Sequence, residues 1–494
     1  MIYMLSDFYS ILLEIYILIN IIILLIYGVF FTSSSTIGFP ILSKNLGKLT
    51  LQILLFGLYL AIYKETINLI SWNNSLVFDN FSYGAQIIIL LTVTSWFFIT
   101  FIYSVQQKIT SFEFWVLILL AMISMLLIVR VYDLLIIYLA LELQALVFYV
   151  LASFKRTSEF STEAGLKYFI LGAFSSAFLL FGSSLIYNLT GVTNLNDFSK
   201  LFTGFPVNSI LISSGIKTGL MFILVALLFK VSASPFHMWA PDVYEGSMIT
   251  VTAFFSTVPK LTAFSVLFRL LFFAFHDWIG WWSLILLPCI LLSLVIGTLG
   301  AFTQIKLKRF MAYGSINHIG FLLLGLITGT TSGIFSVLFY LLVYIITTIG
   351  IFGFIMSLKE YKYPKVYQMR YLENLSMLAV TNSILAFTIL IFLFSMAGVP
   401  PLAGFFSKLF VLLVAMQNSN IGISIIAVTM SCVACFYYIR LIKYVYFEKK
   451  KYWPIFLKVD KPNSLIIGLS ILLLSGLCLD LELVTIISTF MSIS

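Results

Sequence analysis

Long apolar runs separated by short polar segments make up most of the chain. Each run is close to the ~20 residues that an α-helix needs to cross a bilayer. The pattern therefore predicts an all-α polytopic membrane protein with about 14 transmembrane helices. The approximate limits of the predicted spans are 10–32, 48–64, 84–104, 112–131, 133–153, 165–189, 210–245, 248–275, 279–303, 309–328, 334–358, 378–416, 421–447 and 464–490.

Two of these spans, 210–245 and 378–416, are too long for one straight crossing. As continuous helices they would run about 50–60 Å, against a hydrocarbon core of about 30 Å. Each contains a helix breaker, which is Pro235 in the first span and the run Gly398–Pro401 in the second. Because proline removes a backbone donor and clashes with the preceding turn, we predict that helices 7 and 12 are discontinuous. Broken helices persist in a membrane only where protein buries them or where they line a wet cavity.

The two breaks lie five spans apart, so spans 4–8 and spans 9–13 are expected to be corresponding halves. Because five is odd, the second half starts from the opposite face, which predicts two inverted five-helix repeats. Paired broken helices in such halves are typical of the ion path of a transporter, although two ordinary proline kinks are the alternative. The single membrane domain (1–494) then divides into N-terminal helices 1–3 (1–104), a first repeat (112–275), a second repeat (279–447) and a C-terminal helix (464–490).

The distribution of Lys and Arg tests the number of spans. If successive loops alternate between the two sides, one side receives Lys44, Lys48, Lys108, Lys155, Arg156, Lys306, Lys308, Arg309, Lys359, Lys362, Lys365, Arg370, Lys443, Lys449, Lys450, Lys451, Lys458 and Lys461. The other side receives Lys64, Arg130, Lys200 and Lys217. A miscounted span would scramble this asymmetry. By the positive-inside rule the rich side faces the matrix or the cytoplasm, and both termini face the opposite side.

Composition supports a membrane protein and excludes a nucleic-acid-binding one. The chain is 61% hydrophobic and 10% charged, with a mean hydropathy of +1.10, whereas soluble domains have about 25% charged residues. The net charge of +9 comes mostly from Lys and Arg in the short loops between apolar runs, which is the pattern of membrane topology and not of a nucleic-acid-binding surface. Residues 1–7 carry no Lys or Arg before the first apolar run, which is unlike a cleavable signal or a transit peptide. We expect the chain to enter the membrane where it is made.

Several ionisable residues fall inside predicted spans, and those that stand out are Glu142, Lys230, Lys260 and Lys408. A charge at the bilayer centre costs at least ~2.5–3.5 kcal/mol, so each needs a reason. One structural explanation is snorkelling, in which the charged end of the side chain reaches the lipid headgroups. It suits Arg269 near a span end and fits Lys260 at mid-span poorly. Another is a static ion pair, but one carboxylate does not neutralise several lysines. A desolvated lysine changes charge near neutral pH, which suits a proton relay.

Polar neighbours extend this set. Thr252, Ser256 and Lys260 recur every four residues and share one helix face. His318 lies in span 10, where a histidine either relays protons or is a satisfied hydrogen-bonding residue. His237, just beyond the first break, is expected mainly to shape the broken segment. Lys167 is either a surface partner of Glu163, four residues earlier, or a partner of Glu142 on the preceding helix.

No cofactor motif accompanies these residues. The four cysteines lie in apolar runs, and Cys432 with Cys435 forms a lone C-x-x-C that is expected to be structural. There is no Gly-rich phosphate loop and no His/Cys cluster with metal-ligand spacing. We therefore expect no redox centre, no bound cofactor and no metal in this chain.

Several long motifs resemble the family of mitochondrial NADH dehydrogenase subunit 2 and its bacterial counterpart, antiporter-like membrane subunits of respiratory complex I. They are LELQ at 141–144 with STEAGLKYF at 161–169, LFKVSASPFHMWAPDVYEG at 228–246, AGVPPLAGFFSK at 397–408 and CFYYIR at 435–440. The resemblance covers roughly residues 80–447. Within the family, subunit 5 has a long lateral helix that this chain lacks, and subunit 4 carries Glu where this chain has Lys408.

The resemblance implies fourteen helices, two inverted repeats and proton pumping coupled to NADH oxidation by ubiquinone. By family role, Glu142 and Lys167 would pair between helices 5 and 6. Lys230, Lys260 and Lys408 would be the lysines of helices 7, 8 and 12. The set of expected proton-translocating residues is Glu142, Lys167, Lys230, Lys260, His318 and Lys408.

The resemblance also implies the setting. NADH, FMN, iron–sulfur clusters and ubiquinone would bind to other subunits of the complex, and the partners would include the sister subunit 4, the small subunit 4L and membrane lipids. The 49 Phe residues and the low charge suggest an organelle-encoded chain of the mitochondrial inner membrane rather than of a bacterial plasma membrane. Two alternatives remain, a subunit of a multisubunit cation/proton antiporter and a structural membrane scaffold without transport.

Overall fold

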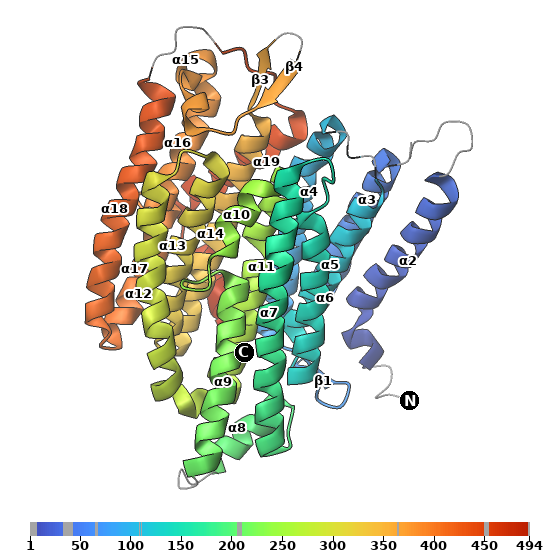
Figure 1. Ribbon diagram of the computed structural model, residues 1–494, viewed down its shortest axis with the longest axis vertical. Helices are drawn as coiled ribbons and strands as arrows, with labels where there is room; N and C mark the ends of the chain where they lie inside the picture. Colours follow the sequence, from blue (N-terminus) through green and yellow to red (C-terminus); the bar gives the residue numbers. More distant parts are fainter. Residues whose placement is uncertain are drawn as a thin grey trace.

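A computed structural model describes residues 7–32, 43–64, 68–107, 109, 111–204, 210–362, 365–448 and 454–492. The long helices are α2 (Leu12–Thr32), α3 (Ser43–Tyr63), α4 (Asn80–Gln106), α5 (Glu113–Arg130), α6 (Leu134–Ala152), α7 (Glu159–Thr190), α9 (Ile210–Val231), α11 (Ile249–Phe268), α12 (Ile279–Thr303), α13 (Leu307–Leu326), α14 (Thr331–Ser357), α18 (Ile421–Tyr446) and α19 (Lys461–Leu479). Shorter helices are α8 (Leu195–Gly204), α10 (Trp239–Gly246), α15 (Leu378–Thr381), α16 (Ser383–Ala397), α17 (Ala403–Gln417) and α20 (Glu482–Ser492). The long helices stand side by side in one bundle (Figure 1).

The helices confirm an all-α polytopic membrane protein. Eleven of the described helices are long and apolar enough to cross a membrane, and the bent pair α19–α20 makes up to 12. Two further segments follow the predicted order: α13, which carries charge in its first turn, and the broken pair α16–α17. Together they match the predicted succession of fourteen segments. The inverted-repeat relation between the two halves stays a prediction.

Both predicted breaks are present. In the first, α9 ends at Val231 and α10 begins at Trp239, and Ser232 adopts a left-handed backbone. In the second, α16 ends at Ala397 and α17 begins at Ala403; Gly398 closes α16 with φ +82°. Glycine suits that cap because it has no side chain to strain a positive φ.

The structure corrects two predicted boundaries. Helix α7 begins at Glu159, six residues before the predicted limit, since polar residues follow the cap position Ser158 and a helix begins at its cap rather than at its first apolar residue. The last predicted span is divided, because the Asp480 carboxylate accepts a hydrogen bond from the Glu482 amide and starts α20 as a new helix. The predicted span 248–275 agrees with α11 and the π-helical turn that continues it, Arg269–Ala274.

Two short antiparallel hairpins in the loops were not predicted. Strand β1 (Leu69–Ser71) pairs with β2 (Leu76–Phe78), with Leu69 opposite Phe78. Strand β3 (Lys359–Lys362) pairs with β4 (Lys365–Gln368), with Lys359 opposite Gln368. The hairpins lie at opposite ends of the bundle, β1 beside α8 at one end and β3–β4 beside α15 at the other (Figure 1).

Contacts between loops support the alternation of the spans. At one end, Leu76 bridges Val131 and Asp133 bridges Asn194. At the other end, Lys306 bridges Tyr371 and Glu360 bridges Phe456. The first group follows predicted spans 2, 4 and 6, and the second follows spans 9, 11 and 13, so loops of like parity meet. Of the charged loop residues, Lys108 and 449–451 lie outside the described residues.

This arrangement predicts the result of labelling from each side of the membrane. With the native cysteines replaced by serine, a cysteine at the exposed position Arg156 should react from the matrix or cytoplasmic side. A cysteine at Asn74, exposed in the β1–β2 turn, should react from the opposite side. The measurement is modification by a membrane-impermeant maleimide in sealed vesicles of either orientation. Reaction of both positions from one side would contradict the topology.

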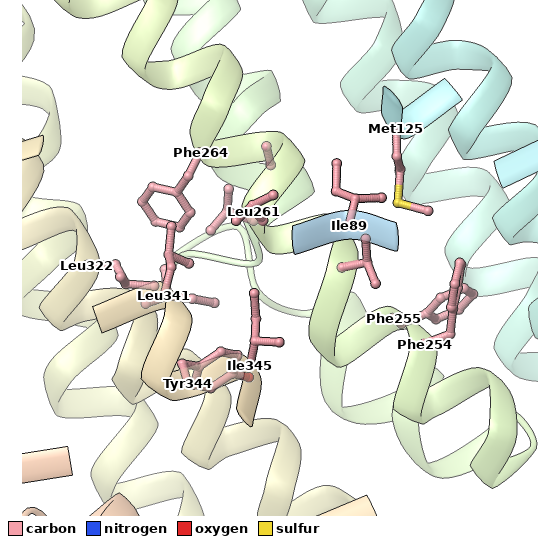
Figure 2. Packing of buried hydrophobic residues seen from close by; sticks show 14 of the residues in the cluster. Ile89, Met125, Phe254, Phe255, Leu261, Phe264, Leu322, Leu341, Tyr344 and Ile345 are labelled. Atoms are coloured by element: carbon pink, nitrogen blue, oxygen red, sulfur yellow. The ribbon is translucent and has the colours of Figure 1, made fainter. Parts of the chain in front are cut away.

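Helix α11 lies at the centre of the bundle. All of its residues except Pro259 are buried, and it contacts α4, α5, α9 and α14. Figure 2 shows Leu261 and Phe264 of α11 near Leu341 of α14, with Ile89 of α4 and Met125 of α5 on another side. A helix surrounded in this way has no face toward lipid, so a charged residue on α11 must be accommodated by protein.

Candidate functional site

Lys260 is the charged residue of this central helix. Its side chain is buried, and its ammonium donates a 2.7 Å hydrogen bond to the hydroxyl of Tyr344 on α14. The ammonium also lies over the Tyr344 ring, 4.5 Å from the centroid, where the negative face of the ring attracts a cation. No carboxylate among the described residues forms an ion pair with Lys260. Snorkelling and a static ion pair both fail to describe it.

A small cavity connects Lys260 with Lys230, near the end of α9. It holds about 30 Å³ of space, enough for about two water molecules. We call it the Lys230 cavity; Tyr168, Trp239 and Tyr244 also line it. The Trp239 indole donates a 2.9 Å hydrogen bond to the carbonyl of Phe229, which also accepts from the Ser232 amide, so a side chain helps to satisfy the first break.

His318 on α13 sits beside Tyr344 on the other side. The two rings are 5.4 Å apart between centroids. Its Nδ1 is 2.6 Å from the hydroxyl of Tyr340, and its Nε2 is 3.4 Å from the hydroxyl of Tyr438. His318 is therefore a buried imidazole with a hydroxyl at each nitrogen, which allows either nitrogen to give or take a proton.

Lys408 on α17 occupies the second break. It is buried, and its ammonium donates hydrogen bonds to the carbonyls of Met396 (3.0 Å) and Ala397 (2.7 Å), the last residues of α16. A cation there satisfies carbonyls that the break leaves free and interacts favourably with the negative end of the helix dipole. No carboxylate among the described residues pairs with it.

A second small cavity joins Lys408 to His318 and Tyr344. This Lys408 cavity has about 10 Å³ of space, near the minimum for one water molecule. Tyr340 and Ser407 also line it. Tyr344 therefore borders the Lys408 cavity while bonding to Lys260, which borders the Lys230 cavity. The structure brings Lys230, Lys260, His318 and Lys408 into one continuous series.

Glu142 lies at the edge of this series, on α6. It is partly buried, forms no ion pair with any described residue, and interacts electrostatically with Lys230. The expected pair between Glu142 and Lys167 is absent. Lys167 instead binds Glu163 at 2.8 Å and Asp242 at 2.9 Å, and its side chain is 44% exposed.

The reason is a group of carboxylates at the charge-rich end. Asp242 on α10 also accepts a 2.6 Å hydrogen bond from Arg309, and Glu245 pairs with Lys306 and Arg309. Lys167 lies one helix away from these carboxylates, since α7 packs against α10. The surface pair Glu163–Lys167 is confirmed, and Asp242 was missed because it is 75 residues away in the sequence.

The predicted polar stripe contributes little to the series. Thr252 and Ser256 are buried, but each hydroxyl bonds to a carbonyl three residues earlier in its own helix. His237 is buried with Nδ1 unpartnered. The expectation of packed thiols holds for buried Cys289 and is wrong for Cys432, which is exposed.

Arg269 was expected to reach the membrane surface, and this is wrong. It is 2% exposed, pairs with Asp79 at 3.1 Å and donates to the carbonyl of Val129 at 3.0 Å. Arg269 is the first residue of the π-helical turn, and its side chain is buried in the bundle. Arg269 and Asp79 form a static ion pair that joins the end of α11 to the start of α4.

A second static pair was not predicted. Arg130, fully buried, binds Glu14 at 2.8 Å, and Gln86 donates to the same carboxylate oxygen at 2.8 Å. Lys64 lies nearby, and burial together with the charge of Arg130 lowers its pKa to about 8, against the opposing effect of Glu14. These residues lie at the charge-poor end, away from Lys260. The described residues contain no group of three or more His, Cys, Asp or Glu able to hold a metal ion.

Tyr344, Tyr340 and Tyr438 are the partners that sequence reasoning missed. Tyrosine in an apolar helix is usually a packing residue, so nothing marks one as a partner of a buried cation. Spacing was the available signal. Tyr340 and Tyr344 stand four residues apart on one face of α14, as two hydroxyl groups in an otherwise apolar run.

Comparison with known proteins agrees with the predicted family. The family described as "NADH:quinone oxidoreductase/Mrp antiporter, TM" matches residues 131–434. NADH-ubiquinone oxidoreductase chain 2 of Marchantia polymorpha is 44% identical over 94% of each chain. That of Arabidopsis thaliana is 41% identical over 95% of this chain and 93% of its own. NADH-quinone oxidoreductase subunit N of Rhodobacter capsulatus is 39% identical over 86% of each.

Solved structures agree as well. A chain of respiratory complex I from Thermus thermophilus has a TM-score of 0.78 and 27% identity, covering 96% of this chain and 98% of that one. A chain of the Mrp complex from Dietzia shares the fold with a TM-score of 0.83 at 19% identity, covering 98% of this chain and 97% of that one. The chain therefore belongs to the NADH:quinone oxidoreductase/Mrp antiporter family and, within it, to the group of NADH-ubiquinone oxidoreductase chain 2 and bacterial subunit N.

Proposed function

We propose that this chain translocates protons as a membrane-arm subunit of respiratory NADH:ubiquinone oxidoreductase. The observation that carries the proposal is the contact of Tyr344 with Lys260 on one side and His318 on the other. Lys260, His318 and Lys408 are buried ionisable side chains that follow one another near the two helix breaks, and no carboxylate among the described residues pairs with them. A bilayer protein keeps such residues at a large cost, and a proton path explains why.

The proposed route begins at Glu142 and passes to Lys230 by electrostatic coupling. It crosses the Lys230 cavity to Lys260 and passes to the Tyr344 hydroxyl, and from there it reaches His318 across the Lys408 cavity, which Tyr344 and His318 both line. From His318 it reaches Lys408 through the Lys408 cavity. A hydroxyl both donates and accepts a hydrogen bond, so it passes a proton without keeping a charge. Charge at one station acts strongly on the next, because little water screens it.

Lys167 was expected to be a station and lies off this line. Its two carboxylate partners hold it in the ionic group at α10. We place it at the charge-rich end, where Asp242 links it to Arg309. In this role Lys167 sets the charge around α10, the second part of broken helix 7, rather than pairing with Glu142.

The surrounding complex belongs to the same proposal. NADH, FMN, iron–sulfur clusters and ubiquinone would bind in other subunits, among them the neighbours of this chain, sister subunit 4 and small subunit 4L. The complex would lie in the mitochondrial inner membrane. Within this chain, the first repeat would be 112–275 and the second 279–447. The equivalent breaks in α9–α10 and α16–α17, each closed by a side chain, support this division.

A scaffold without transport is the less suitable alternative. The chain does contain static pairs, Arg130–Glu14 and Arg269–Asp79, and both are direct ion pairs. Lys260 and Lys408 bind a hydroxyl and backbone carbonyls instead. A cation/proton antiporter shares the fold, but the relatives with 41–44% identity are NADH-ubiquinone oxidoreductase chains.

Replacing Tyr344 by phenylalanine tests the proposal directly. The ring beside His318 remains, so packing is kept, while the hydroxyl that accepts the hydrogen bond of Lys260 is lost. We expect proton transfer through this subunit to slow by about 10²-fold, the usual effect of removing a proton-transfer group. The measurement is acidification of sealed vesicles driven by NADH, together with NADH oxidation by the assembled complex.

The matched control is Tyr187→Phe, which removes an exposed hydroxyl from α7. It should leave both rates unchanged. If Tyr344→Phe complexes assemble and acidify vesicles at the wild-type rate, the Lys260–His318 connection is wrong.

A further inference from the structure

A third and larger cavity lies at the charge-rich end, apart from the proton route. It has about 190 Å³ of space. Its wall comes from five elements that are distant in sequence: the C-terminal end of α4, the start of α7, the α10–α11 junction, the start of α13 and the end of β4. We call it the basic cavity. Segments from so many elements form a built pocket rather than a surface groove.

Its charged lining is mainly cationic. Lys155, Lys306, Lys308 and Arg370 face it, against the single acidic residue Glu245. Glu245 is already engaged, since it pairs with Lys306 and with an arginine outside the cavity. Lys155 and Arg370 are exposed and form no ion pair with any described residue. Lys155, Lys308 and Arg370 are therefore an excess of positive charge, and like charges at close range repel unless an anion joins them.

One residue that lines this cavity, Ser247, has a buried hydroxyl without a partner. Ser247 is 1% exposed, and its Oγ has no hydrogen-bond partner. Lys308 holds the same residue in place by donating a 2.6 Å hydrogen bond to its carbonyl. An unsatisfied buried hydroxyl costs free energy, and an anion in the cavity would accept its hydrogen bond. Two independent features, excess positive charge and a free donor, thus indicate the same kind of ligand.

The surroundings indicate where such an anion comes from. Phe160 lines the mouth and is exposed. Leu171 and Phe174 lie on the same face of α7, three and four turns further into the membrane region, and are exposed as well. The charged pair Glu163–Lys167 lies on this face between Phe160 and Leu171, and beyond it the exposed face of α7 is apolar. A headgroup could sit in the cavity while its acyl chains follow α7. Basic pockets between helices on the cytoplasmic or matrix side are suited to anionic headgroups.

We propose that the basic cavity binds a phosphate group, and that the phosphodiester of an acidic phospholipid supplies it. Lys155 and Arg370 would meet the phosphate at the mouth, and Lys308 and Ser247 would meet it at the floor. A partner protein offering a carboxylate is the competing occupant. It fits less well, because a cavity of this size with ammonium, guanidinium and hydroxyl donors exceeds what one carboxylate satisfies. The site is independent of the proton route.

The test uses the intact complex carrying Lys155→Gln with Arg370→Gln. Both side chains are exposed, so the fold should tolerate the change. The control is Arg156→Gln with Lys443→Gln, which removes two exposed charges from the same side but outside the cavity. Each complex is reconstituted in phosphatidylcholine nanodiscs containing a minor fraction of phosphatidylglycerol. Bound phosphatidylglycerol is then counted by native mass spectrometry. A parallel arm titrates detergent-solubilised complex with inorganic phosphate.

We expect the Lys155/Arg370 variant to bind phosphatidylglycerol roughly tenfold more weakly, as the loss of two basic contacts implies. The control variant should bind it as the wild type does. Ser247→Ala, which changes no charge, should weaken binding by a smaller factor. If inorganic phosphate shows the same dependence and the lipid does not, the phosphate site is supported and the lipid source is overturned. If both probes bind all four proteins equally, or bind none, the cavity is not a phosphate site.

Discussion

Replacing Lys260 by methionine should block proton transfer while the complex still assembles. Methionine has a similar length and no charge, so it fills the space that the Lys260 side chain occupies but does not make the 2.7 Å hydrogen bond to Tyr344. The route then has no basic group between Lys230 and His318. We expect transfer through this subunit to slow by ~10²-fold or more. NADH-driven acidification of sealed vesicles measures it.

A control variant and the stability of the Lys260→Met complex separate this result from a folding defect. Lys443→Met removes the same charge from an exposed position, where the side chain is 66% accessible, and should change nothing. Because Lys260 has no carboxylate partner, its neutralisation leaves no unpaired buried charge, and stability should not fall. Assembled Lys260→Met complexes with wild-type acidification and wild-type NADH oxidation would remove Lys260 from the route.

The fold followed from the sequence where one local property decides the outcome. Apolar length alone determines whether a segment spans a bilayer, so the succession of spans was correct. The breaks at Pro235 and at Gly398–Pro401 were correct because proline and glycine act on their own backbone. The bend before α20 was missed, since Asp480 caps a helix only in a particular backbone geometry.

The site was predictable in its charges but not in their partners. Lys260 and Lys408 stood out because a charge within an apolar run is costly wherever its neighbours are. Their partners depend on packing: Tyr344 is 84 residues from Lys260, and the carbonyls that bind Lys408 become acceptors only because α16 ends there. Lys167 shows the opposite error. The family resemblance implied a pair with Glu142, whereas packing of α7 on α10 brought Asp242 within reach.

The static ion pairs were also not predicted, because their partners too are distant in the sequence. Arg130 and Glu14 are 116 residues apart, on helices α5 and α2 that only the folded bundle brings together. Near a span end, arginine is as compatible with snorkelling as with burial. Only the structure shows that Arg130 and Arg269 have carboxylate partners, whereas Lys260 has a hydroxyl partner.

Removing Glu14 should have the largest effect on stability. Its carboxylate is 4% exposed and Arg130 is fully buried, so Glu14→Leu leaves an unpaired charge inside the bundle. We expect a loss of ~3–5 kcal/mol, typical of breaking a buried ion pair. Helix α2 should then detach first, because this pair joins it to α5. The measurement is the thermal unfolding of the purified complex, with the protease sensitivity of the α2–α3 region as a local readout.

The double variant Glu14→Leu with Arg130→Met distinguishes lost attraction from stranded charge. Replacing both partners of a buried pair by apolar residues is often neutral or stabilising. We therefore expect the double variant to recover most of the stability that Glu14→Leu loses, even though it contains two changes. Gln86, which donates to the same carboxylate, would then be the remaining polar group. If the double variant were less stable than Glu14→Leu, the pair would contribute through attraction, and the stranded charge of Arg130 would not be the cause of the loss.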